Sequence, residues 1–476
     1  MSREPDNGPV NKLASKVARH IEADIARRGW RIGESLGSEQ ALQRRHGVSR
    51  SVLREAVRLV EHHQVARMRR GPGGGLLICE PDAGPATRAV VIYLEHLGTT
   101  LVDLLNARLV LEPLAASLAA ERIDEAGIDR LRAVLRAEEH WTPGAPAPRD
   151  EFHIALAEQS KSPLLQLFID ILMRLTTRYA RQSRPDSATE AIEAVDHMHH
   201  DHSRIVAAVT AGDAARAKTL SERHIEAVTA WLREHHPGGG QASRRGRAAR
   251  SRPAPRLEGD EPPGKLAETV AAAIGEEIVA GGWAPGSVFG TEPALLERYR
   301  VSRAAFREAV RLLEYHSVAH MRRGPGGGLI VARPRAEASI DTIALYLQYR
   351  KPTRGDLRCV RDAIEIDNVA RVVKRRKEFA GFDAAALVHD VADEERFHLG
   401  LARLAGNALL DLFLRIIFEL FRRQWSTTGQ SLPTRADVAA VEHAHHRILL
   451  AIEAGDDSLA RYRVRRHLDA AASWWL

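Results

Sequence analysis

The chain has 476 residues, 44% of them hydrophobic, which is enough for roughly three or four domains with packed cores. Its formal net charge of +7 favours a polyanionic partner. Only two cysteines are present, Cys79 and Cys359, which excludes a disulfide framework or a cysteine-based metal site. The N-terminal sequence lacks the apolar segment of a signal peptide, and no run of about 20 apolar residues occurs. We therefore expect a soluble, cytoplasmic protein without a membrane partner.

The first predicted element is a helix over residues 11 to 28, with apolar residues at four-residue spacing on one side. A second helix, capped by Ser38, is expected over 38 to 46, and a third begins after Ser49. The tight turn around Gly47 makes the pair a helix-turn-helix. Two short strands, VARMRR and LLICE, follow and are joined by a glycine-rich tip, which is typical of a wing.

This block occurs twice in the chain. Residues 48 to 76 and 301 to 329 are identical at 22 of 29 positions, with a constant offset of 253. One repeat of about half the chain length indicates two copies of a whole multi-domain unit rather than a solenoid. Residues 44 to 70 hold eight arginines against two acids, and residues 297 to 323 hold seven against three. Each copy is expected to offer a cationic surface to a phosphate backbone.

Helical periodicity dominates the region after each block, and short connections predict an antiparallel bundle. In the first copy we expect helices over 89 to 97, 101 to 122, 125 to 140, 150 to 159, 163 to 182, 189 to 211 and 213 to 235, after a connector from Pro81 to Pro85. The fold class is mainly α, with two winged helix-turn-helix domains, each carrying a small β-hairpin wing and each followed by an all-α antiparallel bundle. The expected domains are the winged domains 1 to 80 and 263 to 333, the bundles 85 to 236 and 337 to 476, and a flexible basic linker, 237 to 262.

Four landmarks, Gly-Trp, Ser/Thr-Glu, Val-Ser-Arg and Arg-Glu-Ala-Val, occur in both winged blocks. With them, residues 11 to 80 and 264 to 333 resemble the winged helix-turn-helix of GntR-family transcription regulators. The resemblance implies a regulator, not an enzyme, that binds a palindromic or pseudo-palindromic operator in double-stranded DNA. Arginine reads guanine through a bidentate fork, and backbone contacts position the helix. The residues expected at the DNA are Ser49, Arg50, Ser51, Arg54, Arg69, Arg70 and Gly71 in the first copy, and Ser302, Arg303, Arg307, Arg322, Arg323 and Gly324 in the second.

A histidine pattern recurs in the two bundles, and its last two members are 22 residues apart in both. Three imidazoles from three helices can converge on a divalent metal such as Zn or Ni. The bundles resemble the FCD effector domain of the FadR-like branch of the GntR family. That resemblance implies that an acidic residue before the first histidine completes a metal site, and that a small organic acid or acyl metabolite binds there. The implied ligands are Glu394, His398, His445 and His467 in the second copy, and Asp150, His153, His202 and His224 in the first.

Three arginines are candidates for effector binding. Arg149 lies four residues before His153, where a cation disfavours a metal and could instead hold an effector carboxylate. Arg108 and Arg361 each precede a glutamate by four residues, which is most often a structural ion pair. In the resembled domain an arginine on this helix can reach the pocket. The alternative to a metal site is that these histidines are buried core side chains whose ring nitrogens form hydrogen bonds within the protein.

Two other functions compete with the regulator. The chain could be an architectural DNA-binding protein with ligand-free bundles. Three histidines and a carboxylate also describe a catalytic zinc site, although no further acid or base stands at a diagnostic spacing. A flexible linker of about 26 residues has a typical end-to-end distance of roughly 25 to 30 Å, close to the roughly 34 Å between half-sites. Either an intrachain pseudo-dimer or a homodimer is therefore possible, and covalent linkage favours the intrachain pair.

Overall fold

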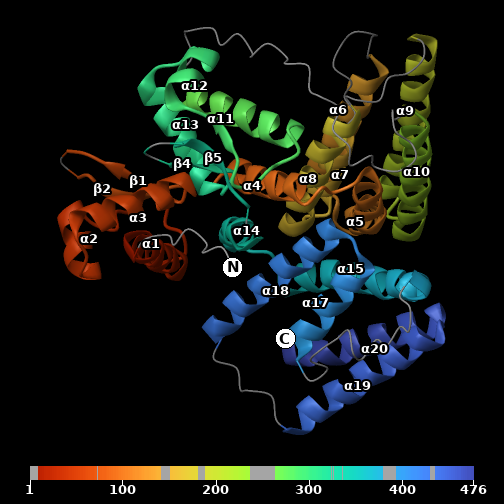
Figure 1. Cartoon of the computed structure of the whole chain (residues 1–476). Coiled ribbons are helices and arrows are strands. Elements are labelled where there is room, and N and C mark those ends of the chain that lie inside the picture. Colours follow the sequence, from red (N-terminus) through yellow and green to blue (C-terminus); the bar gives the residue numbers. More distant parts are fainter. Residues whose placement is uncertain are drawn as a thin grey trace. The chain divides into compact units, whose positions relative to one another are not determined.

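The computed structural model describes residues 9–71, 73–140, 151–180, 188–235, 263–322, 324, 326–334, 336–378, 393–428 and 435–475 (Figure 1). The chain forms two compact units. The first comprises Met1–Ala89 with Ile340–Pro352, and the second comprises Val90–Ser339 with Thr353–Leu476. In the described residues, no helix combines the length and the apolar character that crossing a bilayer requires.

The first unit contains the first winged helix-turn-helix. Its elements are α1 (Pro9–Arg27), α2 (Glu39–His46), α3 (Arg50–His62), β1 (Ala66–Arg69) and β2 (Gly75–Ile78). Ser38 caps α2 and Ser49 caps α3, as expected, because each hydroxyl accepts a hydrogen bond from a backbone N–H of the first turn. Gly47 ends α2 with a φ of 63°, which allows the tight turn between the helices. β1 and β2 pair antiparallel as the wing.

The second winged domain repeats this order within the second unit. It consists of α11 (Pro263–Ala280), β3 (Val288–Gly290), α12 (Glu292–Tyr299), α13 (Arg303–Tyr315), β4 (Ala319–Arg322) and β5 (Gly328–Val331). The three strands form an antiparallel sheet in the order β3-β5-β4. Trp283 is 8% exposed and its counterpart Trp30 is 6% exposed, so both tryptophans belong to the cores.

The first bundle has the helices that periodicity predicts. They are α4 (Ala83–His96), α5 (Leu101–Arg122), α6 (Glu125–Glu139), α7 (Glu151–Gln159), α8 (Pro163–Ala180), α9 (Ala188–Thr210) and α10 (Ala214–His235). One expectation is wrong: α4 begins at Ala83, so part of the connector predicted from Pro81 to Pro85 is helical. Proline is compatible with the first turn of a helix, because the N–H that it lacks would have no partner there.

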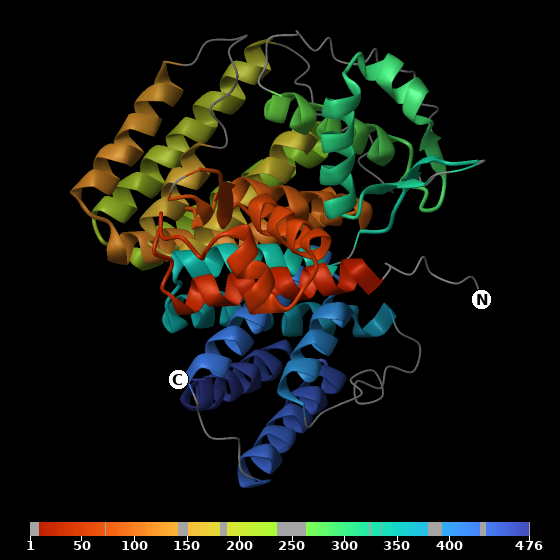
Figure 2. The same ribbon diagram turned by 90° about the vertical axis from the view of Figure 1, so that its left-hand side faces the viewer.

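The second bundle follows the same plan. Its helices are α14 (Ala336–Arg350), α15 (Arg354–Arg375), the short η1 (Arg376–Glu378), α17 (Glu394–Ala405), α18 (Ala408–Thr428), α19 (Arg435–Ala454) and α20 (Asp457–Trp475). The α15 helix contacts α17, α18, α19 and α20, and these four helices are the blue ones in the lower part of Figure 2. Both α5 and α15 begin with a capping box, in which Thr100 and Thr353 exchange hydrogen bonds with an aspartate three residues later.

The two bundles contact each other within the second unit. Phe168 of α8 and Phe413 of α18 stack with ring centroids 3.9 Å apart. Arg122 Nη1 lies 2.8 Å from Asp356 Oδ1, and Asn407 Nδ2 donates to the backbone oxygen of Asp103. Phe168 and Phe413 occupy equivalent positions in the two copies, because the offset over α8 and α18 is 245. Contact between equivalent residues is what a pseudo-two-fold interface produces.

Each winged core also includes residues from a connecting helix of the other copy. Leu345 of α14 is 4% exposed and belongs to the first winged core with Leu53 and Val60. Ile92 of α4 packs against the second winged core, which contains Phe306. The two connecting helices are therefore exchanged between the copies.

Candidate nucleic-acid interface and metal centres

The N-terminal end of each recognition helix is exposed and capped by serine. Ser49 Oγ accepts a hydrogen bond from Val52 N and lies 3.0 Å from Ser51 Oγ. Ser302 Oγ accepts from Ala305 N in the second copy. Free N–H groups and the positive end of the helix dipole suit a phosphate at this position.

The arginines predicted to read DNA share one solvent-facing side of each recognition helix. The Nε atoms of Arg50 and Arg54 both donate to Glu39 Oε1, at 3.0 and 2.8 Å. In the second copy, Arg303 Nε lies 3.3 Å from Glu292 Oε1. A carboxylate on the preceding helix thus holds two guanidinium groups side by side in the first copy and contacts one in the second. The exposed members of the set are Arg50, Arg54, Arg303 and Arg307.

The wing residues lie at exposed positions around the hairpin tips. Arg69 is the last residue of β1, and Arg70 and Gly71 follow it. In the second wing, Arg322 Nη2 donates to the backbone oxygen of Gly326. Gly71 and Gly324 have φ values of 96° and 95°, a backbone conformation that glycine adopts without strain. Arg323 lies outside the described residues, as do Arg149 and Asp150.

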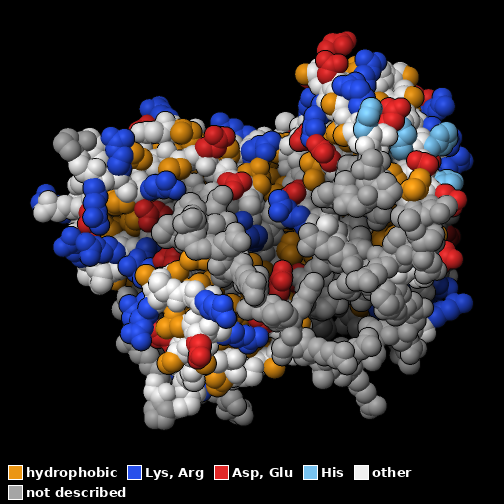
Figure 3. Space-filling view, turned by 90° about the horizontal axis from the view of Figure 1, so that it is seen from above, with side chains coloured by type: hydrophobic (Ala, Val, Ile, Leu, Met, Phe, Trp, Pro, Cys, Tyr) orange, Lys and Arg blue, Asp and Glu red, His pale blue; other side chains and the backbone are white. Residues whose placement is uncertain are grey.

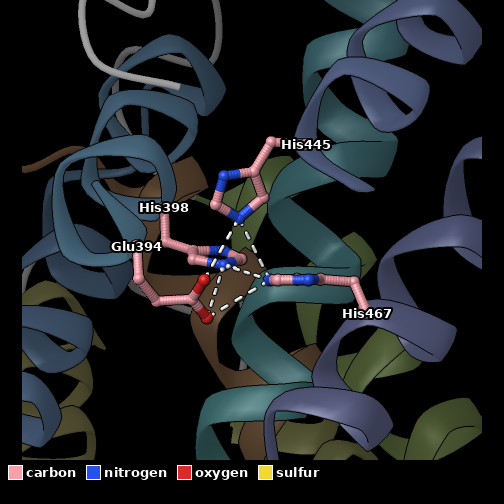
Figure 4. A group of neighbouring side chains, drawn as sticks. All are labelled: Glu394, His398, His445 and His467. Atoms are coloured by element: carbon pink, nitrogen blue, oxygen red, sulfur yellow. Dashed lines mark hydrogen bonds and ion pairs between the residues drawn. The ribbon is translucent and has the colours of Figure 1, made fainter. Parts of the chain in front are cut away.

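Four side chains converge in the second bundle, as Figure 4 shows. His398 and Glu394 come from α17, His445 from α19 and His467 from α20. The Nε2 atom of His467 lies 3.0 Å from that of His398 and 3.1 Å from that of His445. The oxygens of Glu394 lie 3.2 Å from the Nε2 atoms of His445 and His467. The structure therefore brings together all four residues that the sequence indicates for this copy.

These distances fit the ligand set of one divalent ion. Ligand atoms about 2.0 to 2.1 Å from a zinc ion are about 3.0 to 3.4 Å from one another, depending on the coordination geometry. Among the described residues, Glu394 Oε2 is buried and has no hydrogen bond of normal geometry. A buried carboxylate oxygen facing imidazole nitrogens is costly without a positive charge between them. The donor set of three nitrogens and one carboxylate suits zinc or nickel.

A second carboxylate orients the first histidine from behind. Glu365 Oε2 of α15 contacts Nδ1 of His398, so Nε2 of His398 points into the cluster. Burial disfavours the charged imidazole, but Glu365 and Glu394 more than offset it and raise the pKa of His398 to about 10. Burial lowers the pKa of His445, which favours the neutral form that binds metals.

The first bundle holds three histidines in a related arrangement. His153, His202 and His224 come from α7, α9 and α10, and their ring nitrogens lie within 4.8 Å of one another. His202 Nε2 lies 3.2 Å from His224 Nε2. Burial lowers the pKa of both of these imidazoles. In the part of the first copy that the structure describes, no carboxylate joins this cluster as Glu394 joins the other.

The two effector-helix arginines differ in their contacts. Arg108 is buried, pairs with Glu112, and its Nη2 lies 3.3 Å from His153 Nε2. Arg361 is equally buried but donates to Asp362 through Nε and Nη2, at 3.0 and 2.8 Å. The guanidinium therefore adjoins the histidine cluster in the first copy and turns toward a neighbouring aspartate in the second.

Several residues at these sites were not predicted. Glu112 and Glu365, which we expected only as ion-pair partners, also contact Nδ1 of the first histidine of each cluster. Glu138 contacts Nδ1 of His202 at 2.8 Å, and Asp201 contacts Nδ1 of His224. For Glu112 and Glu365 a signal existed, since both stand at the same place in the repeat. For Glu138 no such sequence signal existed, because the sequence of the helix that carries it is poorly repeated in the second copy.

Comparison with known families accounts for both kinds of domain. The model described as "Bacterial regulatory proteins, gntR family" matches residues 13–75 and again 266–328. The model described as "FCD domain" matches residues 103–227 and again 356–470. The chain belongs to the GntR family. It carries the DNA-binding and effector domains of that family twice, as a tandem duplication, and is a ligand-responsive transcription regulator.

Relatives of this GntR chain are about half as long. The Uxu operon regulator of Haemophilus influenzae is 26% identical over 232 residues, which cover 47% of the chain and 84% of the relative. The HTH-type transcriptional regulator LutR of Bacillus subtilis is 30% identical over 203 residues, covering 41% of the chain and 90% of LutR. Among solved structures, a Streptococcus agalactiae GntR protein aligns with 46% of the chain and 99% of its own, at 22% identity and a TM-score of 0.31.

Proposed function

We propose that one chain reads one operator as a pseudo-dimer, with both winged domains on the same DNA duplex. The observation that carries this proposal is the contact between equivalent residues of the two bundles, Phe168 and Phe413, within one compact unit. Separate GntR protomers would have to associate to form such an interface, whereas here the covalent linkage supplies it at high effective concentration. A homodimer of chains, with four heads, is the alternative.

In this proposal the recognition helices α3 and α13 enter the major groove. Arg50, Arg54, Arg303 and Arg307 contact bases or phosphates, the serines at the helix ends hold phosphates, and the wing arginines lie near the minor groove. The heads differ at Ser51/Ala304 and Arg67/His320, so the two half-sites are similar but not identical.

The bundles are the sensing part. Glu394, His398, His445 and His467 hold a divalent ion such as zinc or nickel, which neutralises the buried carboxylate and stabilises the junction of α17, α19 and α20. A small organic acid binds in the bundles and favours one arrangement of the connecting helices over another. Because α4 and α14 reach the winged cores, a shift of either helix changes how the heads fit the operator. The chain acts by binding and catalyses no reaction.

The test begins with selection of duplexes from a randomised pool by the full chain. We expect a pseudo-palindrome with two related half-sites about one helical turn apart. Addition of organic acids to the complex should then change its affinity, measured by fluorescence anisotropy at fixed salt. Recovery of random, unrelated duplexes that no acid affects would instead support an architectural protein with ligand-free bundles.

A further inference from the structure

The first bundle has a cavity of about 350 Å³ that lies beside its histidine cluster and opens to the surface. Its inner end is formed by Arg108 and His153, both buried. The walls between this end and the surface are mainly apolar and come from α8, α9 and α10. They include Met173, Thr176, Met198, Val228, Trp231 and Leu232. Asp201 also lines the cavity, where its carboxylate contacts Nδ1 of His224. A chamber of this size with one polar end can accept a small amphiphilic molecule.

Two substitutions between the copies bear on this cavity. Met173 and Thr176 of α8 correspond, at the offset of 245, to Phe418 and Phe421 of α18. Both phenylalanines are buried, and the Cζ atom of Arg361 lies 5.9 Å from the centroid of the Phe421 ring. The aromatic rings therefore occupy in the second copy the positions that line the chamber in the first.

The inner end of the cavity has unused hydrogen-bond donors. Arg108 donates to Glu112 through Nε and Nη2, and Nη2 also adjoins His153. Among the described residues, Nη1 of Arg108 has no partner. A buried guanidinium has five N–H donors, and the two on Nη1 suit a carboxylate oxygen.

The charges around the two clusters also differ. In the second copy Glu394 and Glu365 both contact His398, and Arg361 pairs with Asp362. In the first copy Arg108 is balanced by Glu112. The first copy has Arg149 where the second has Glu394, four residues before the first histidine. Among the described residues no carboxylate takes the place of Glu394 in this cluster, and the guanidinium of Arg108, 3.3 Å from His153 Nε2, is a cation that disfavours a divalent ion there.

The outer rim of the cavity is acidic, whereas its inner end carries the positive charge of Arg108. Glu193 and Glu234 are exposed there, together with His197. Figure 3 shows histidine side chains with acidic ones beside them over the α9–α10 side of the first bundle. A second carboxylate at the far end of a ligand would meet these acids, which is unfavourable.

We infer that this cavity is a metal-independent receptor for a monocarboxylate with an apolar chain or ring. The carboxylate accepts hydrogen bonds from Nη1 of Arg108, and the apolar body lies against Met173, Met198 and Trp231. The second copy keeps the metal cluster instead, so the two halves have different tasks. This inference rests on the proposed regulator function, of which it specifies the ligand class and the binding half.

Calorimetric titration of the full chain with octanoate tests the inference. Octanoate should bind equally well to protein dialysed against EDTA and to protein reloaded with zinc. Octanamide, which lacks the charge, and suberate, which adds a second carboxylate, should each bind about tenfold more weakly or worse. Failure of octanoate to bind at millimolar concentration, or loss of its binding on chelation, overturns the inference.

Two matched variants locate the binding site. Thr176→Phe places in the first copy the residue that the second copy already has, so a folded chain is expected, with octanoate binding reduced about tenfold or more. Phe421→Thr makes the reverse change in the second copy and should leave octanoate binding intact. Unchanged octanoate affinity in Thr176→Phe contradicts the assignment. Binding of the chain to a DNA duplex is measured in parallel. If the wild-type chain binds no duplex, the regulator function is refuted. If it binds the duplex but not octanoate, only the assignment of the cavity is wrong.

Discussion

The ring of Tyr349 lies edge-on against the ring of Trp30, with centroids 5.4 Å apart and planes at 66°. Tyr349 belongs to α14 of the second copy and Trp30 to the first winged domain. In the second winged domain Trp283 takes the same place, and its partner is His96 of α4, 5.1 Å away. His96 and Tyr349 are equivalent at the offset of 253. Each tryptophan is thus contacted by a connecting helix of the opposite copy.

The first prediction concerns this exchange. Leu345→Ala removes a buried side chain of α14 from the first winged core, at a cost of about 2 to 5 kcal/mol. Hydrogen exchange should become faster in α1 and α3, which form that core, and remain unchanged in α11 and α13. Mass spectrometry of the exchanging full chain resolves these helices.

Ile92→Ala is the matched control, because Ile92 is the equivalent residue of α4. It should loosen α11 and α13 and leave α1 and α3 unaffected. If Leu345→Ala accelerated hydrogen exchange in α11 and α13 instead, each connecting helix would pack against the winged domain of its own copy. The exchange of connecting helices between the copies would then be contradicted.

Sequence periodicity predicted the individual helices well but could not predict this exchange. The start of α5 follows from local chemistry, since Thr100 and Asp103 form a capping box whatever the helix packs against. The packing partner of a helix, in contrast, does not follow from local sequence, because Ile92 and Leu345 occupy equivalent apolar positions in the two copies. Either residue can fill either core, and only the three-dimensional arrangement distinguishes them.

The candidate sites were predictable to a similar extent. Similar spacing in the two copies, with the last two members 22 residues apart in both, indicated the three histidines of each cluster, and the resemblance to the FCD domain indicated Glu394. The second role of Glu112 and Glu365 was missed, because an arginine four residues earlier already explained each glutamate. The effect of Phe418 was missed as well, since Met173 and Phe418 are both apolar and their exchange leaves the hydrophobic pattern unchanged.

Metal content provides the second prediction. The full chain, loaded with zinc and dialysed, should retain about one ion per chain, which His445→Ala with His467→Ala abolishes. The corresponding first-copy pair, His202→Ala with His224→Ala, should leave the metal content unchanged. Elemental analysis by mass spectrometry gives both numbers. Equal zinc in the wild-type chain and in the second-copy double variant would rule out the metal centre.

The third prediction concerns protons. In the ion-free protein the pKa of His398 is raised to about 10, so this imidazole is charged at pH 7.5. Its charged form stabilises the fold below the unfolded pKa of about 6.5, and that contribution is lost as the pH rises through about 10. Metal ligation needs the neutral form, so zinc should release about one proton per chain at pH 7.5.

Calorimetry of zinc binding in buffers of different ionisation enthalpy measures this release. Glu365→Gln removes the carboxylate that contacts Nδ1 of His398 and should decrease the number of protons released. A release that is zero in the wild-type chain, or that Glu365→Gln leaves unaltered, would show that His398 is neutral before zinc binds.

The fourth prediction concerns assembly. A chain of 52.6 kDa that forms its own pseudo-dimer should sediment as one chain, alone and on a short operator duplex. Phe168→Asp places a charge against Phe413 in the interface between the bundles and should lower duplex affinity without releasing smaller species, since the halves remain linked. A two-chain species that persists at nanomolar concentration and binds DNA as such would favour the homodimer.

The central claim, that α3 and α13 read DNA, is tested most directly by titrating a selected duplex at fixed salt. The chain carrying both Arg50→Ala and Arg303→Ala is compared with the wild-type chain. Arg461→Ala, which removes one arginine charge from α20, is the control for the electrostatic effect of each lost arginine. We predict a loss of about 1 to 3 kcal/mol for each recognition arginine, with weaker discrimination between the selected and a scrambled duplex, and no loss of discrimination in the control. Equal affinity of the wild-type chain and the double variant for the selected duplex would contradict the account.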